Sequence, residues 1–177
     1  FGNSKTCRND NSSRFGKFTQ MLFDEFGTLY GSRCVTYLLE KSRIVIQNEG
    51  ERNYHIFHQL LASGKDIKKA LHLTNCTAES FKYTMSGDTA LQYIEGESDG
   101  DKFKKTLSIL SLLSVSDETQ HKMLQILSAI LHLGSIEFEG DSDESRISDK
   151  CYSNGVVTLL CSLLGLEESH LGQMLST

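Results

Sequence analysis

The 177-residue sequence has no proline, no long apolar run and no excess of positive charge. None of its apolar runs approaches the roughly 20 residues that a helix needs to cross a bilayer, so we expect no direct membrane insertion. The net charge of −5 does not provide the basic face that nucleic-acid binding requires, which argues against nucleic acid as a partner. For the missing proline we have no physical explanation.

The cysteines also lack the close-paired spacing of a zinc site or a disulfide framework. They are scattered along the chain and odd in number, a pattern that favours free, mostly structural thiols in a reducing compartment. The five are Cys7, Cys34, Cys76, Cys151 and Cys161.

The length is sufficient for one domain with a sizeable buried core. The sequence has no internal repeat, linker or low-complexity tract, which predicts one compact piece. It begins with Phe1 and ends inside a helix-like pattern near Leu175, so we expect an internal segment of a longer protein.

The most informative stretch runs from Asn9 to Arg14, where hydrogen-bonding side chains follow one another until Phe15. A strand pattern follows directly. A polar loop that leads into a strand can place hydroxyl and amide groups around phosphate and magnesium. Taken by composition alone, such a cluster favours a surface turn, because Asn, Asp and Ser side chains bond to their own backbone.

Alternation with a period of two predicts a β-hairpin after this loop. Its strands are expected at 17–24 and 28–40, with a turn at Gly27 and a bulge or bend at Gly31. Residues 1–8 are expected to be the end of a helix that passes into the loop. A hairpin of this kind would lie at the edge of a larger sheet.

From Gly50 the period changes to that of a helix. The first helix is expected to bury Tyr54, Phe57 and Leu60 and to end at Gly64 as a C-terminal cap. A later helix is expected to begin with Ser116 as its N-cap. Further expected elements are helices at 66–73, 101–113, 116–134 and 155–164, the start of another from 167, an extended piece at 136–139 and an acidic loop at 140–145.

Four blocks of the sequence resemble the myosin motor domain in order and approximate spacing. They are FGNSKTCRNDNSSRFGKF at 1–18, YLLEKSRIV at 37–45, GERNYHIFHQLL at 50–61 and AILHLGSIEF at 129–138. The first block looks like switch I of that family, and the resemblance covers essentially the whole chain. Departures are few: Ser4 stands where alanine is usual, His58 where tyrosine is usual and Ser135 where asparagine is usual.

Kinesins are the nearest family that could be confused with this one. Their switch I also carries Asn, Ser, Ser and Arg, but it continues with Ser-His, whereas this chain continues with Phe15, Gly16 and Lys17. The block at 53–57 also favours myosin.

The resemblance implies an α/β P-loop NTPase fold of the myosin/kinesin motor type, of which this chain would be a fragment. The fragment would be mostly helical, with an edge β-hairpin of the central sheet. Residues 1–177 would be a partial motor domain. Within it, 1–17 would be the switch I region, 17–40 the hairpin and 50–177 the helical upper 50-kDa region.

The resemblance also implies an actin-based motor that couples Mg-ATP binding and hydrolysis to movement along actin filaments, in the cytoplasmic actin cytoskeleton. The cofactors would be ATP and Mg²⁺. Ser13 would be the magnesium ligand, and Ser12 would position the attacking water or relay its proton. Asn9 would contact the phosphates and Asn11 would support the loop. Arg14, otherwise a surface arginine, would form a salt bridge with a switch II glutamate and close the site.

Two parts of such a site do not occur in this sequence. There is no Gly-x-x-x-x-Gly-Lys-Ser/Thr motif and no switch II segment. We therefore expect ATPase activity of the longer protein and none of this segment alone. Light chains or calmodulin would bind a neck outside the segment. Two alternatives remain open: a catalytically inactive myosin-like scaffold for actin or other partners, and a stand-alone helical interaction module.

Other candidate groups favour structural roles. His55 and His58 are expected to be a packed pair because no third metal ligand has matching spacing. His132 is expected to be a hydrogen-bonded core histidine. The block 40–43 is expected to form structural ion pairs. The acidic run at 137–144 is expected to be a solvated loop that resembles loop 4 of myosins, with at most a minor contact to acidic actin.

Overall fold

The computed structural model describes residues 1–91, 93–140 and 144–176. The strands are β1 Asn3–Thr6, β2 Asn9–Ser13, β3 Gly16–Phe23, β4 Leu29–Tyr37, β5 Tyr93–Ile94, β6 Glu97–Ser98, β7 Phe138–Gly140 and β8 Ser145–Ile147. The α-helices are α1 His55–Leu61, α2 Lys65–Ala70, α3 Lys82–Met85, α4 Asp99–Leu112, α5 Asp117–Leu133, α6 Asp149–Ser153, α7 Val156–Leu164 and α8 Glu168–Leu175. Two short 3₁₀ turns are η1 Lys41–Ile44 and η2 Ala78–Ser80.

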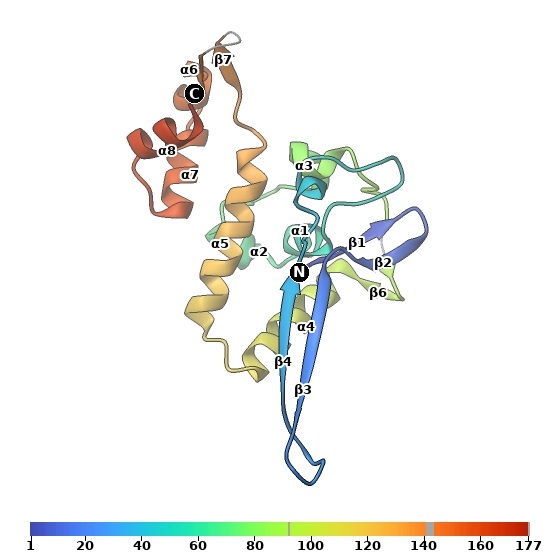
Figure 1. The fold of residues 1–177 in the computed structure, drawn as a ribbon. Helices are drawn as coiled ribbons and strands as arrows, with labels where there is room; N and C mark the ends of the chain where they lie inside the picture. Colours follow the sequence, from blue (N-terminus) through green and yellow to red (C-terminus); the bar gives the residue numbers. More distant parts are fainter. Residues whose placement is uncertain (92, 141–143, 177) are drawn as a thin grey trace.

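Two N-terminal hairpins adjoin a helical body (Figure 1). The β1–β2 hairpin lies against that body, whereas β3–β4 projects away from it. One core forms around α1, α4 and α5, and its fully buried members include Leu60, Leu71 and Leu131. A second core joins α5 to α6, α7 and α8. Among the described residues, no helix is long and apolar enough to span a membrane.

The first thirteen residues differ from the prediction. The sequence predicts the end of a helix at 1–8 and a loop after it. In the structure, β1 lies within the first of these segments and β2 within the second, and the two strands pair antiparallel with Ser4 opposite Ser12. The Asn3 side chain holds the pair together: its amide donates to Asn11 Oδ1 (3.0 Å), and its Oδ1 accepts from Ser13 Oγ (3.3 Å). Asn is depleted in strands in general, so propensity gave no sign of this pairing.

The predicted second hairpin is confirmed by β3 and β4, which pair antiparallel. Gly27 in the connecting turn has a φ of 79°, a value that residues with a Cβ rarely adopt. The register shifts between Leu22 and Phe23, beside Gly31, as the predicted bulge requires. That this hairpin forms the edge of a larger sheet stays a prediction.

The expected end of the first helix is wrong. α1 ends at Leu61 with Ala62 as its cap, and Gly64 lies in extended backbone (φ −64°, ψ 159°). The Gly64 carbonyl accepts from the Lys68 amide at 3.0 Å, so this glycine begins α2. A glycine between two short helices fits either role, and only the backbone conformation distinguishes them.

The two longest helices agree with the sequence pattern. In α5, the Ser116 side chain accepts from the Thr119 amide (3.3 Å), which confirms the predicted N-cap, and Gly134 follows the last helical residue. α4 begins two residues earlier than expected, because Ser98 caps it by accepting from the Asp101 amide at 3.1 Å.

The C-terminal part also follows the predicted order. α7 stops at Gly165, whose φ of 67° is left-handed, and α8 comes next. The extended piece becomes β7, which pairs with β8. Most of the predicted acidic loop between these strands, at 141–143, lies outside the described residues.

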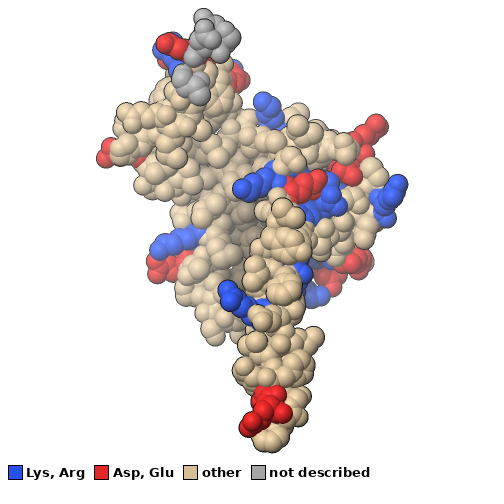
Figure 2. Space-filling model, viewed as in Figure 1, with Lys and Arg blue, Asp and Glu red and all other residues tan. Residues whose placement is uncertain are grey.

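The projecting hairpin exposes an unusual amount of apolar surface. Met21 and Phe23 on β3 are 60 % and 55 % exposed, and Phe26 at the tip is 85 % exposed. Figure 2 shows that most of this arm is uncharged on the face in view, with acidic side chains gathered at its tip. Exposed apolar side chains on a two-stranded ladder with open edges favour association with other strands.

We therefore expect the 177-residue chain, expressed alone, to self-associate. The double variant Met21→Lys/Phe23→Lys should raise the monomer fraction, because charges on an open edge oppose strand pairing. Light scattering after gel filtration measures this fraction. Phe138→Lys changes a side chain of similar exposure (52 %) outside the hairpin and should leave association unchanged. A monomeric parent chain with a sharp two-state melt would contradict this prediction.

Candidate functional site

The predicted site residues lie together on β2 and immediately after it. Ser12 and Ser13 occupy successive strand positions, so their side chains leave the strand on opposite faces. Ser13 is exposed and contacts Asn3 across the pair, whereas the Ser12 hydroxyl accepts from Arg14 Nη1 at 3.2 Å. The strand thus presents two neighbouring hydroxyls in two directions.

Asn9 stabilises the start of the strand. Its side-chain oxygen accepts from the Asn11 amide at 2.8 Å, an Asx-type bond to its own backbone. The Thr6 hydroxyl donates to the Asn9 carbonyl (3.1 Å) and closes the tight β1–β2 connection. Asn9 remains exposed, so its amide group also faces solvent.

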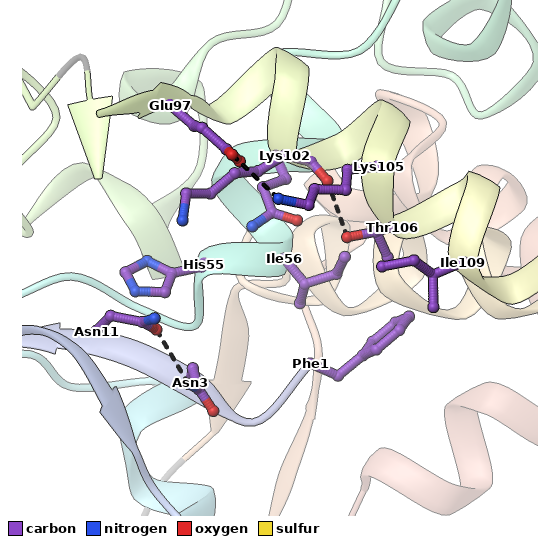
Figure 3. Close-up of a pocket in the computed structure, with 11 residues that line it drawn as sticks. Phe1, Asn3, Asn11, His55, Ile56, Glu97, Lys102, Lys105, Thr106 and Ile109 are labelled. Atoms are coloured by element: carbon purple, nitrogen blue, oxygen red, sulfur yellow. Dashed lines mark hydrogen bonds and ion pairs between the residues drawn. The ribbon is translucent and has the colours of Figure 1, made fainter. Parts of the chain in front are cut away.

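Asn11 joins β2 to the helical body. Its amide donates to Glu95 Oε2 at 3.0 Å, and Lys102 Nζ on α4 donates to the same oxygen at 2.9 Å. Asn11 also lines a cavity of about 250 Å³, where it lies beside His55 while Lys102 and Lys105 extend from α4 (Figure 3). Any displacement of this part of β2 therefore disturbs contacts to α1 and α4.

Arg14 contacts a carboxylate that the sequence did not identify as its partner. Arg14 Nε lies 2.7 Å from Glu40 Oε2, and Arg43 Nε lies 2.7 Å from the same oxygen. Arg43 Nη1 also bonds Glu51 Oε2 at 3.0 Å. The expected structural ion pairing of the block 40–43 is confirmed, and it extends to Arg14.

Burial alone would raise the pKa of Glu40, but hydrogen bonds from Arg14 and then Arg43 outweigh it and hold the pKa below its ordinary value. Burial would also raise the pKa of Glu51, but hydrogen bonds from Arg43 and from the Cys7 backbone amide lower it below its ordinary value. Both carboxylates are therefore ionised at neutral pH.

Two buried histidines lie next to a buried ion pair. Arg52 is 2 % exposed and its Nη2 lies 2.6 Å from Asp99 Oδ2. His55 and His58 are 5 % and 4 % exposed, which agrees with the packed-pair interpretation. Within the described part of the chain, neither ring nitrogen of His55 completes a hydrogen bond of normal geometry, and no cluster of three metal-ligand side chains occurs.

Burial and then the charge of Arg52 lower the pKa of His55 to about 4. The same two causes, in the same order, hold the pKa of His58 well below its usual value. Both side chains are neutral at pH 7, so neither adds positive charge beside Arg52.

His132 is a half-buried residue that packs against Phe81. Its ring meets Phe81 edge-on with centroids 5.1 Å apart, and burial lowers its pKa. Among the described residues its Nε2 has no hydrogen-bond partner, so the expected hydrogen-bonded core histidine is only partly confirmed.

Two ion pairs near the candidate site were not predicted from the sequence. Arg14 and Glu40 are 26 residues apart, and only the β3–β4 register brings them together, with the Glu40 amide donating to the Arg14 carbonyl (3.0 Å). Arg52 and Asp99 lie 47 residues apart, with nothing in the local pattern to link them. The sequence gives one indication of the Arg14–Glu40 contact: the two residues have opposite charge and flank the predicted hairpin.

The histidine pKa values predict acid sensitivity. His55 has a pKa near 4 when folded and about 6.5 when unfolded, so the unfolded state binds its proton first as pH falls. Stability should be complete above pH 6.5 and decrease between pH 6.5 and 4, by at most about 3 kcal/mol for this residue. Thermal melts at pH 7.5 to 5 test this. His55→Asn should weaken the dependence without abolishing it, because the low pKa of His58 remains, and the exposed control His170→Asn should keep it; equal slopes for all three proteins would refute the assignment.

Comparison with known proteins agrees with these local observations. The family model for the myosin head (motor domain) matches residues 1–177. The chain is 44 % identical over 168 residues to Myosin-2 of Saccharomyces cerevisiae, covering 94 % of the chain and 10 % of that protein. It is 47 % identical over 174 residues to unconventional myosin-Vb of Mus musculus, covering 96 % of the chain and 9 % of that protein.

A third relative is unconventional myosin-Vc of Homo sapiens, 43 % identical over 175 residues, with 98 % of the chain and 10 % of that protein covered. The chain thus spans about a tenth of the length of the curated relatives it matches. With the family model matching from the first residue to the last, the chain belongs to the myosin head (motor domain) family.

Proposed function

We propose that this chain supplies the switch I region and part of the actin-binding upper 50-kDa region of an actin-based motor. Residues 1–17 would be switch I, 17–40 the edge hairpin of the central sheet and 50–177 the helical upper region. The observation that carries the proposal is the strand that presents the Ser12 and Ser13 hydroxyls on opposite faces, followed by Arg14. The family membership of the whole chain supports it.

The local chemistry fits Mg²⁺ and a triphosphate. Ser13 is exposed, and among the described residues its hydroxyl makes only a long contact to Asn3 (3.3 Å), which leaves a hard oxygen available for the metal. One protein oxygen is sufficient, because Mg²⁺ retains waters and phosphate oxygens as its other ligands. The metal would neutralise charge on the transferring phosphate.

The remaining roles follow from position. Ser12, on the other face of the strand, would orient the attacking water, since placing that nucleophile is the main task of the protein in phosphoryl transfer. Asn9 is exposed at the start of β2 and would contact the phosphates. Asn11, fixed by Asn3 and Glu95, would hold the strand in position.

Arg14 would close the site by pairing with a switch II carboxylate of the longer protein. A guanidinium can grip a carboxylate through two parallel hydrogen bonds, so the pair depends on the exact position of the strand. The site would therefore close only when the γ-phosphate is bound.

The helical body would transmit this closure to actin. β1 connects to the body through a bridge between Ser4 and Tyr54, and the Arg52 amide donates to the Lys5 carbonyl at 3.2 Å. Packed interiors move as units, so a shift of the strands displaces α1 and its neighbours. The actin filament would be the partner of the whole motor in the cytoplasmic cytoskeleton, with light chains or calmodulin on a neck beyond this segment.

The test is the actin-activated ATPase of the full-length protein that carries this segment. Ser13→Ala and Arg14→Ala should each lower turnover by about 100-fold, the usual cost of removing one positioned electrostatic group. Ser153→Ala and Arg146→Ala make the same chemical changes at exposed positions on α6 and β8 and should leave turnover unchanged. Unchanged turnover in both site variants would overturn the role assignments, and an inactive parent would support the scaffold alternative.

A further inference from the structure

The Glu40 carboxylate has an arrangement that the proposed role of Arg14 does not explain. One oxygen, Oε2, accepts from two guanidinium groups at the same distance, 2.7 Å from Arg14 Nε and 2.7 Å from Arg43 Nε. Arg43 also reaches Oε1 through Nη2 at 3.4 Å. Glu40 thus has one partner from switch I and one from the turn that follows the hairpin.

The two arginines are not equivalent. Arg43 is 5 % exposed and is fixed by Glu51 at 3.0 Å and by the Arg52 carbonyl at 3.3 Å. Arg14 is 29 % exposed, and its other contact is the Ser12 hydroxyl. Arg43 is therefore the permanent partner of Glu40, and Arg14 is the one that can leave.

We propose that Glu40 holds Arg14 while the nucleotide site is open, and that Arg43 is the counter-charge that lets Glu40 release it. The inference rests on the proposed role of Arg14 in closing the site. Arg14 then exchanges one carboxylate for another, and Glu40 acts as a positioning residue.

The energetics of this exchange follow from the shared oxygen. A carboxylate that loses its only partner in a half-buried site is left unpaired, which is costly. Glu40 retains both Arg43 bonds after Arg14 leaves, so no charge is stranded. Two guanidinium groups on one oxygen also repel each other, which weakens the hold on the more exposed one.

The backbone around Glu40 stays in place during the exchange. Tyr54 at the start of α1 donates its hydroxyl to the Glu40 carbonyl at 2.8 Å, and the Arg43 amide donates to the same carbonyl at 3.2 Å. Glu40 is therefore a fixed point on the helical body against which the side chain of Arg14 moves.

The experiment compares two affinities of the full motor domain: that for Mg-ADP with vanadate, a phosphate analogue that selects the closed site, and that for Mg-ADP alone. Glu40→Gln removes the charge that retains Arg14 and should raise the ratio of these affinities about two- to fivefold, the range for partly exposed ion pairs. Arg43→Gln leaves Arg14 as the main partner of Glu40 and should lower the ratio. The two variants should change the ratio in opposite directions, whereas a general loss of stability would change it in the same direction in both. Thermal melts measure the stability of each variant independently.

Glu118→Gln is the matched control, because it makes the same chemical change in an ion pair with Lys122 (2.6 Å) on α5, away from Arg14, and it should leave the ratio unchanged. If Arg43→Gln does not fold, Glu40→Gln decides by itself.

Arg14→Ala separates the two proposals. If it abolishes the tightening by vanadate while Glu40→Gln leaves the ratio unchanged, the exchange is overturned and the closing role of Arg14 stands. If Arg14→Ala has no effect on the tightening, the proposed function itself fails.

Discussion

The complete burial of residues 51–61 is the constraint on which the rest of the structure depends. This segment carries Arg52, Asn53 and His55 as well as apolar residues, so its burial requires polar partners from elsewhere in the chain. Asn53 provides several of these links: its amide donates to the carbonyls of Ile44 (2.8 Å) and Tyr83 (2.7 Å), and its oxygen accepts from the adjacent amide. This one side chain therefore links η1, before the segment, to α3, after it.

The same burial explains how a surface strand can be coupled to a helical core. β1 lies between β2 and the buried segment, bonded to one through its ladder and to the other through the Ser4–Tyr54 bridge. Asn11 adds a second route through Glu95 to α4. A change at β2 thus reaches the helices along two short paths, each made of hydrogen bonds rather than of flexible linkers, and this makes a nucleotide-dependent displacement of the body physically reasonable.

Sequence periodicity was sufficient for the longer helices and for the β3–β4 hairpin, although this hairpin buries neither face. α4, α5 and α7 show helical spacing with caps at Ser116 and Gly165, and β3–β4 shows alternation around Gly27. The pattern failed at β1 and β2, because the groups that join them are short polar side chains bonded across the pair. It failed again at Gly64, where a glycine between helices has two possible roles.

The candidate site was predictable in its residue types but not in its contacts. The hydroxyls and amides of β2 are visible in the sequence, and the family resemblance suggests their roles. The partner of Arg14 is not visible, because Glu40 reaches it only through the register of a hairpin whose strands are eight and nine residues long. Glu40 lies three residues beyond β4, so its position also depends on the backbone between them. Contacts of this kind depend on tertiary structure alone.

The Arg52–Asp99 and Arg14–Glu40 ion pairs differ in how readily they can separate. Arg52 and Asp99 are 2 % and 14 % exposed, and Asp99 has no second cation within ion-pair distance in the described part of the chain. Separating them would leave two desolvated charges, which typically costs several kcal/mol. Arg14 and Glu40 are 29 % and 33 % exposed, and Arg43 remains on Glu40 when they separate. Desolvation therefore fixes the segment before α1 to the start of α4, whereas the shared charge leaves the Arg14 side chain free to change partner.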